Sequence, residues 1–123
     1  MQLERELERR VSELQGMKDG WDGEGSRRPL SGALATVPVL GRAILDQADE
    51  ELPHALNISA ARNGAVCFTL FGKAGREVEL WMEEAPRRVS FLAFDGDEEF
   101  EGWIDAEEFS RVGAWLNGRA DSI

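Results

Sequence analysis

The chain has 123 residues, 24 acidic against 14 basic, with one cysteine and one histidine. This length predicts a single domain over residues 1–123 that can bury a core without disulfides or a structural metal. The net charge of −10 disfavours direct binding to nucleic acid or to an anionic membrane, because phosphate groups are bound by Lys and Arg.

The sequence carries no signal for export or for a membrane span. No apolar run approaches the roughly 20 residues that cross a bilayer, and six of the first ten residues are charged, unlike a signal peptide. The lone Cys67 agrees with a reducing compartment. We therefore expect a cytoplasmic protein.

Two helices are expected in the N-terminal part. Leu3, Leu7, Val11 and Leu14 recur at helical spacing over residues 2–15. A glycine-rich loop around Trp21 follows, and a second apolar stripe then runs from position 30 to position 48. Its start has two solutions. The helix begins with Ser31 as cap and bends at Pro38, or it begins near Thr36 with Pro38 in its first turn.

From Ala55 the apolar period changes from helical to alternating, which predicts strands. Asn63-Gly64 predicts a two-residue type I′ hairpin, and a further turn is expected at Glu84-Ala85-Pro86. Short connections between strands predict an antiparallel meander. The expected strands are 55–60, 66–71, 77–82, 89–94 and a short one near 100–103.

A third helix is expected over residues 104–118. Asp105 would be its N-cap with Glu108 at the third helical position, and Asn117-Gly118 would end it. The order of elements predicts an α+β fold: an antiparallel meander of about five strands, with two N-terminal helices and one C-terminal helix packed on it.

The negative charge is concentrated near the C-terminus. Residues 95–123 hold nine acids and two bases, a net −7, and eight of these acids fall between Asp95 and Glu108 without a base. Such a segment is either a solvated, solubilising surface or a docking surface for a basic protein. The sequence leaves both interpretations open.

Two tryptophans share predicted strand faces with acidic residues. Trp81 alternates with Glu77 and Glu79, and Trp103 with Glu99 and Glu101. An aromatic ring surrounded by carboxylates is typical of an anchor in a protein interface. The alternative is that both rings cover the second face of the sheet beneath the N-terminal helices.

Other chemistry has little support in the sequence. Asp95, Asp97 and Glu99 have the spacing of the first calcium-loop ligands, but Phe100 and Ala106 stand where Gly and a bidentate Glu are needed. His54 and Cys67 are each the sole residue of their type, which disfavours a zinc site or a Cys-His nucleophile. We expect no enzyme and no cofactor. A hydrolase with paired carboxylates stays a third class, since the separation of carboxylates is not visible in a sequence.

The segment Trp21-Asp22-Gly23-Glu24-Gly25-Ser26, followed by Pro29, stands between two predicted helices and ahead of the strand meander. With these elements, roughly the first two thirds of the chain resembles a group of short bacterial proteins that carry a Trp-Asp-Gly-x-Gly-Ala or -Ser segment. The resemblance implies a structural loop and no particular activity. In size, acidity and element order the chain is also similar in type to small immunity proteins, antitoxins and phage inhibitors of host defence.

We therefore expect a non-catalytic protein that binds and inhibits or regulates a basic protein partner, one that handles nucleic acid. The alternative is a small-ligand or cation-binding sensor domain with a pocket near Trp21. The sequence leaves self-association open. The candidate partner-binding residues are Trp81, Asp95, Asp97, Glu98, Glu99, Glu101 and Trp103.

Overall fold

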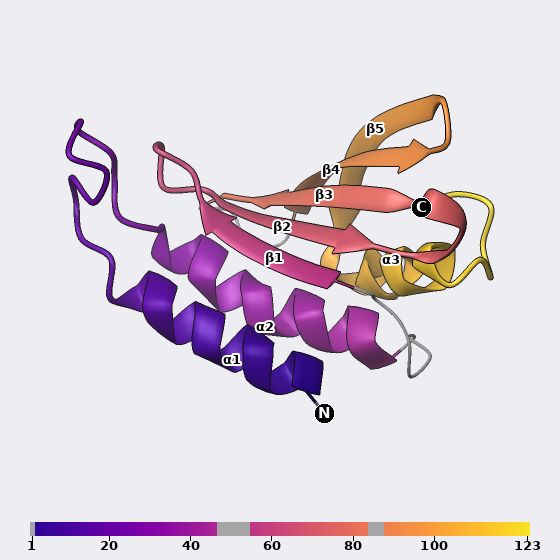
Figure 1. Cartoon of the computed structure of the whole chain (residues 1–123), viewed down its shortest axis with the longest axis horizontal. Coiled ribbons are helices and arrows are strands. Elements are labelled where there is room, and N and C mark those ends of the chain that lie inside the picture. The colour runs from indigo at the N-terminus through magenta and orange to yellow at the C-terminus, as the bar shows by residue number, and fades with distance from the viewer. Residues whose placement is uncertain (1, 47–54, 84–87) are drawn as a thin grey trace.

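The computed structural model describes residues 2–46, 55–83 and 88–123. Two helices precede five strands, and a third helix follows them (Figure 1). The elements are α1 (Gln2–Gln15), α2 (Ser31–Asp46), β1 (Ala55–Ala60), β2 (Val66–Phe71), β3 (Glu77–Met82), β4 (Arg88–Asp95), β5 (Glu98–Asp105) and α3 (Phe109–Leu116), with single 3-10 turns η1 (Lys73–Gly75) and η2 (Ala106–Glu108). The predicted α+β meander is confirmed.

The five strands form one antiparallel sheet in the order β1-β2-β3-β4-β5. One line of directly paired residues crosses the whole sheet, from Ile58 through Phe68, Leu80 and Phe91 to Gly102. Ile58, Phe68, Leu80 and Phe91 are buried, so this side of the sheet faces the core. The same side carries Val78, Met82, Val89, Ala93 and Ile104, all buried as well.

All three helices pack against this buried side of the sheet (Figure 1). Leu7 and Leu14 bring α1 into the core, and Phe109 and Val112 do so for α3. Helix α2 lies between them and contributes Ala33, Val37, Leu40 and Ile44. The fold is therefore a layer of helices on one layer of sheet. No helix within the described residues is long and apolar enough to cross a bilayer.

The structure decides between the two starts considered for the second helix. Helix α2 begins at Ser31 and continues through Pro38. Thr36, which would have been the cap of the shorter helix, lies inside α2, and its hydroxyl donates to the carbonyl oxygen of Gly32 at 2.8 Å. Pro38 lacks the N–H that would bond the carbonyl of Leu34, and its ring is exposed beside a hollow that residues of α1 also line.

The predicted two-residue turn at Asn63-Gly64 is wrong. Ala60 pairs with Val66, so five residues connect β1 to β2. Of the two turn residues, Gly64 alone has a positive φ (90°), whereas a type I′ turn needs two. The Asn63 side chain instead accepts a hydrogen bond from the Ala65 N–H at 3.0 Å, an Asx turn that competes with the tighter hairpin.

The third helix begins later than predicted. Strand β5 runs to Asp105 and the turn η2 follows, so the α-helix starts at Phe109. Half of the predicted capping box is present, because the Asp105 N–H donates to the Glu108 carboxylate at 3.3 Å. Pairing of Asp105 with Arg88 keeps Asp105 in the strand. The turn expected at Glu84-Ala85-Pro86 and the residue His54 lie outside the described residues.

Candidate partner-binding face

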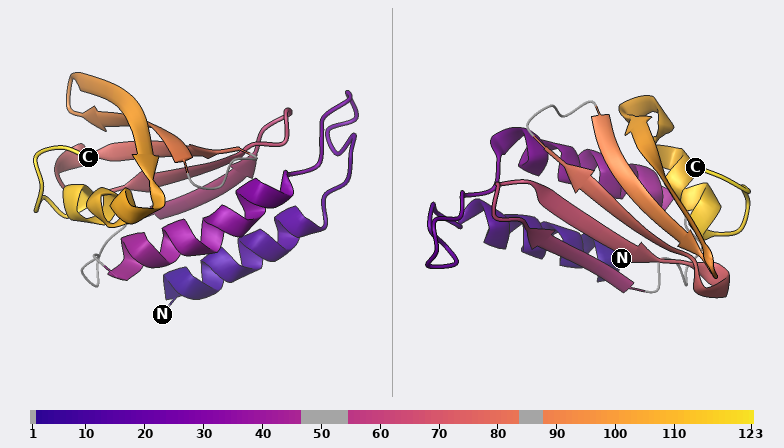
Figure 2. Two further views of the ribbon diagram at one scale, coloured as in Figure 1. Left: turned by 180° about the vertical axis from the view of Figure 1, so that it is seen from behind. Right: turned by 90° about the horizontal axis from the view of Figure 1, so that it is seen from above.

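The sheet has a second side, turned away from the helices, which we call the open face. Figure 2 (right panel) looks onto it, with the strands in front of α1 and α2. Side chains of the other strand parity lie here, since successive residues point to opposite sides. On the three strands that matter below, residues of this parity include Glu77, Glu79 and Trp81 of β3, Ser90, Leu92 and Phe94 of β4, and Glu99, Glu101 and Trp103 of β5. Arg88 and Asp105, which pair with each other at the ends of β4 and β5, have the same parity.

The strand register arranges these residues in three rows. Ser90 is paired on one side with Trp81 and on the other with Trp103. Leu92 lies in the same way between Glu79 and Glu101.

The third row repeats the second. Phe94 is paired with Glu77 and with Glu99, and Phe71 of β2 extends this row beyond Glu77. The open face is thus an aromatic row beside two rows in which an apolar side chain is flanked by carboxylates.

The two tryptophans are not covered by helices. Trp103 is 55% exposed and Phe71 is 38% exposed. Trp81, Leu92 and Phe94 are partly buried by their neighbours in the sheet. The interpretation that Trp81 and Trp103 lie beneath the N-terminal helices is therefore wrong, because α1 and α2 pack on the opposite side.

Several acidic groups elsewhere in the described residues form salt bridges, and four glutamates of the open face do not. On α1, Glu6 and Glu13 form salt bridges with Arg9, and beside α3 Glu108 forms one with Arg111. Within the described part of the chain, no salt bridge involves the four glutamates of the open face. These glutamates are Glu77, Glu79, Glu99 and Glu101. Their charge is directed at solvent or at a partner.

The structure separates the acidic residues singled out from the sequence. Glu99 and Glu101 lie on the open face with Trp81 and Trp103. Glu98 has the parity of Phe100 and Ile104 and is on the helix side of β5. Asp97 belongs to the two-residue turn that joins Asp95 to Glu98.

Asp95 has a structural role on the helix side. Its carboxylate lies 3.3 Å from Nε of Arg76. The Arg76 guanidinium also stacks over the ring of Trp115, 5.0 Å from its centroid, and donates to the carbonyl oxygens of Trp115 and Ala120 at 2.6 and 3.0 Å. Asp95 therefore helps to hold α3 and the C-terminal segment against the sheet.

Sequence reasoning noted Glu77 and Glu79 but placed them outside the candidate site, and it missed Leu92, Phe94 and Phe71. The missing signal was the register between strands. Aligning Trp81 with Ser90 and Ser90 with Trp103 through the two hairpins would have placed all these residues on one surface.

The acids around Trp21 serve the loop itself. Asp22 accepts hydrogen bonds from the N–H groups of Glu24 and Ser26 at 2.9 and 3.3 Å, and its second oxygen lies 2.8 Å from Nε of Arg62. Hydrogen bonds from Ser26 and Glu24, together with the Arg62 charge, lower the pKa of Asp22 to about 2. Asp19 accepts the Arg28 N–H at 2.9 Å, and the Trp21 indole donates to the Arg27 carbonyl at 2.8 Å.

No metal-binding cluster is present in the residues that the structure describes. No group of three or more His, Cys, Asp or Glu side chains converges there. The calcium-like spacing of Asp95, Asp97 and Glu99 does not produce a site, because Asp95 is on the helix side and Glu99 on the open face.

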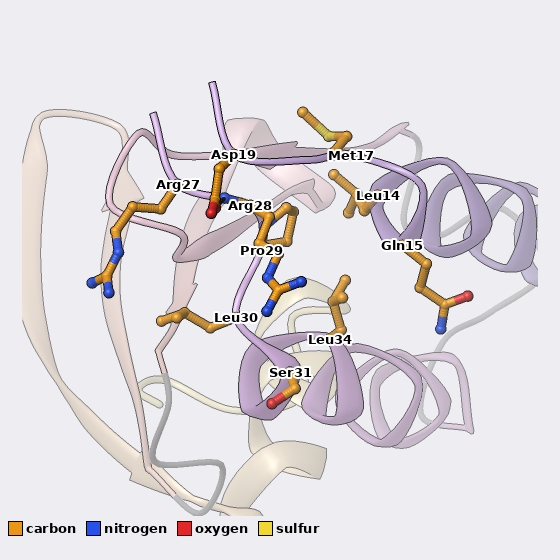
Figure 3. Close-up of a pocket in the computed structure, with 10 residues that line it drawn as sticks. All are labelled: Leu14, Gln15, Met17, Asp19, Arg27, Arg28, Pro29, Leu30, Ser31 and Leu34. Atoms are coloured by element: carbon orange, nitrogen blue, oxygen red, sulfur yellow. Dashed lines mark hydrogen bonds between the residues drawn. The ribbon is translucent and has the colours of Figure 1, made fainter. Parts of the chain in front are cut away.

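A hollow of about 540 Å³ lies between the end of α1, the Trp21 loop and the start of α2 (Figure 3). Its lining includes Met17, Asp19, Arg28 and Leu34, but Trp21 is not part of it. The Asp19 carboxylate there already accepts the Arg28 N–H. The lining also includes Gln15, Arg27 and Ser31, so polar and apolar groups both border the hollow.

Cys67 is buried in β2, next to Thr69 on the same side of the strand. Burial raises the pKa of its thiol; the hydrogen bond with Thr69 opposes this increase in part, and the Glu79 charge adds a smaller increase. The thiol is thus held in its protonated form, which is the opposite of what a nucleophile needs.

No protein-family model matches the chain, and neither the curated proteins nor the solved structures include a match.

Proposed function

We propose that this protein binds a basic protein partner through the open face and thereby inhibits or regulates it, without catalysis. The observation that carries the proposal is the set of four glutamates, Glu77, Glu79, Glu99 and Glu101, which form no salt bridge within the described residues and share the side of the sheet opposite the helices with Trp81, Phe94 and the exposed Trp103. The immunity, antitoxin and anti-defence proteins that the chain resembles in type act in this general manner.

Two parts of the open face would contribute differently to binding. Trp103 and Trp81 supply apolar area and attract cations through their ring faces, so they are the expected anchors. The carboxylates select Lys and Arg and speed association by long-range attraction. Leu92 and Phe94, between the glutamates, keep water away from the contacts once a partner covers them.

The charge of the open face favours a partner that otherwise meets phosphate. A surface that binds nucleic acid carries clustered Lys and Arg, and the four carboxylates of the open face present the same sign of charge as phosphate. Occupation of such a surface by this protein would exclude nucleic acid by competition, so a basic nucleic-acid-handling protein is the partner we propose.

The test is capture of partners from the native host with three forms of the protein as bait. The face variant carries Glu77→Gln, Glu79→Gln, Glu99→Gln and Glu101→Gln. The control variant carries the same change of net charge on other surfaces, through Glu6→Gln, Glu8→Gln, Glu13→Gln and Asp121→Asn. Mass spectrometry quantifies what each bait retains, and Kd is then measured with the purified captured protein.

We expect a basic protein that the wild type and the control variant retain and the face variant loses.

Trp103→Ala should weaken the affinity for this captured protein, with Kd rising roughly 30-fold, since interface tryptophans contribute about 2 kcal/mol or more. Val39→Ala is the matched control, because Val39 is equally exposed (56%) but lies on α2. Equal retention by all three baits would refute the proposal. Stoichiometric heat on titration with calcium or magnesium would favour the sensor alternative instead.

A further inference from the structure

The meander leaves two strand edges, and helix α1 contacts one of them. Strand β1 is the first edge strand. Nε of Arg10 on α1 donates to the carbonyl oxygen of Ile58 in β1 at 2.7 Å, so a backbone group on this edge already has a partner. The second edge is β5, and no strand formed by the described residues lies beyond it.

Strand β5 offers a regular set of backbone groups along this second edge. In an antiparallel sheet, successive residues direct their N–H and C=O groups alternately to the two sides of the strand. The Asp105 N–H donates to the Glu108 side chain outside the ladder with β4. Glu99, Glu101 and Trp103 have the same parity as Asp105, so their backbone groups point outward from the edge.

The same three residues carry the exposed side chains of the open face at this edge. A strand added to β5 would therefore place every second side chain directly opposite Glu99, Glu101 or Trp103. Edge and open face form one continuous surface at β5, and a binding segment can use the backbone and the side chains together.

A second copy of this chain does not fit this edge. Antiparallel pairing of two β5 strands would bring Glu99 and Glu101 of one copy against the acidic β5 of the other, and like charges opposite one another are destabilising. The charge requires an occupant that carries bases at alternate positions.

We propose that the partner docks by adding an extended strand antiparallel to β5, with Lys or Arg opposite Glu99 and Glu101 and an apolar residue opposite Trp103. This inference rests on the proposed function and adds the binding mode to it. The partner's main chain supplies hydrogen bonds to the edge, and its alternate side chains supply the selectivity.

The probe is a blocked peptide, Thr-Leu-Thr-Lys-Thr-Lys-Thr, whose antiparallel alignment sets Leu against Trp103 and the two lysines against Glu101 and Glu99. The control peptide, Lys-Lys-Leu-Thr-Thr-Thr-Thr, has the same composition without the alternation. Binding is followed by NMR, and amide hydrogen exchange is measured for residues 98–105 with and without peptide.

We expect the alternating peptide to bind about tenfold more tightly than the control, since three matched cross-strand pairs contribute roughly 1.4 kcal/mol together. Exchange should slow at the outward amides of Glu99 and Glu101. A second test compares Glu101→Pro with Glu101→Gln. Both remove the charge, but only proline removes the outward N–H, which an edge strand tolerates. The proline variant should bind about fivefold more weakly than the glutamine variant.

Three results would overturn the strand-addition inference. They are absence of peptide binding, binding without slower exchange at the amides of Glu99 and Glu101, and equal affinity of the proline and glutamine variants with native far-UV circular dichroism. None of these results bears on capture of a basic protein by the open face. Failure of the binding mode is thus distinguishable from failure of the proposed function.

Discussion

Two charged side chains, Asp22 and Arg76, tie irregular segments to the sheet. Asp22 closes the Trp21 loop and pairs with Arg62 of the connection between β1 and β2. Arg62 in turn donates to the Glu24 carbonyl at 2.6 Å. Arg76 does the same for the C-terminal segment through its bonds to Trp115 and Ala120. Charged hydrogen bonds of this kind are stronger than neutral ones, so they replace the packing that loops lack.

The Asp22 carboxylate should make stability depend on pH in the acid range. Its pKa in the folded protein is about 2, below the ordinary value of 3.8. The folded state therefore favours the charged form, and the stabilisation is fully present above about pH 4 and lost as the pH falls through 2. Asp22→Asn keeps an oxygen for the Glu24 and Ser26 N–H groups but removes the charge that faces Arg62.

Thermal unfolding of the wild type and Asp22→Asn between pH 2 and pH 6 tests this assignment. We expect the wild type to be more stable at pH 5 and the two melting temperatures to converge between pH 4 and pH 2. A difference that stays constant over this range would show that the Asp22 charge does not stabilise the loop.

At the scale of elements, local periodicity was sufficient for the existence and order of the helices and strands. The leucine spacing gave α1 its observed bounds, and alternation located β2 and β3 to the residue. Local sequence signals gave a wrong prediction where another group of the chain bonds the same backbone N–H and C=O groups. Asn63 bonds its own turn rather than forming the tight hairpin, and Asp105 stays paired in β5 rather than capping α3.

The side of the sheet that the helices cover could not be read from the strands alone. Both parities of β4 are apolar, since Val89, Phe91 and Ala93 face the core while Leu92 and Phe94 do not. The core side was selected by long-range packing with α2 and α3, which no short window of sequence contains. This is also why the open face, and with it the candidate site, was only partly predicted.

The junction between α3 and the turn after β2 depends on one glycine. Gly72 has an ordinary extended φ of −120°, so its role is not conformational freedom. A Cβ at this position would lie 2.5 Å from the backbone oxygen of Leu116 at the end of α3. Gly72→Ala must push α3 away from the sheet, and we expect a loss of about 1–3 kcal/mol in the free energy of unfolding.

Gly16→Ala is the matched control, because a Cβ on Gly16 would have no contact closer than 3.5 Å. Denaturant unfolding of both variants gives the comparison. If Gly72→Ala and Gly16→Ala were equally stable, the close approach of α3 to Gly72 would not be a constraint on the fold.

At the scale of the whole molecule, the two-layer architecture determines where charge can act. The three helices cover one side of the sheet (Figure 1). Because successive residues of β5 point to opposite sides, the acidic C-terminal segment is divided between the two sides of the sheet. Glu99 and Glu101 fall on the open face, whereas Asp97 and Glu98 fall in the turn and on the helix side. All four lie within one short hairpin and contribute to the same negative potential.

We expect the two pairs of acids, Asp97 with Glu98 and Glu99 with Glu101, to affect the rates of association and dissociation of the captured basic partner differently. Electrostatic attraction acts over a Debye length of about 10 Å at 0.1 M salt, which exceeds the spacing of about 3.4 Å between successive strand residues. Asp97→Asn with Glu98→Gln should therefore slow association about as much as Glu99→Gln with Glu101→Gln. Both changes should also reduce the dependence of the association rate on salt.

Dissociation depends on direct contacts, so it should become faster in the Glu99 and Glu101 variant alone. Stopped-flow association and surface-based dissociation measurements at 50 and 500 mM NaCl separate the two effects. Faster dissociation of the Asp97 and Glu98 variant would move the contact surface from the open face to the hairpin turn, and unchanged kinetics in both variants would remove the acidic hairpin from the interface.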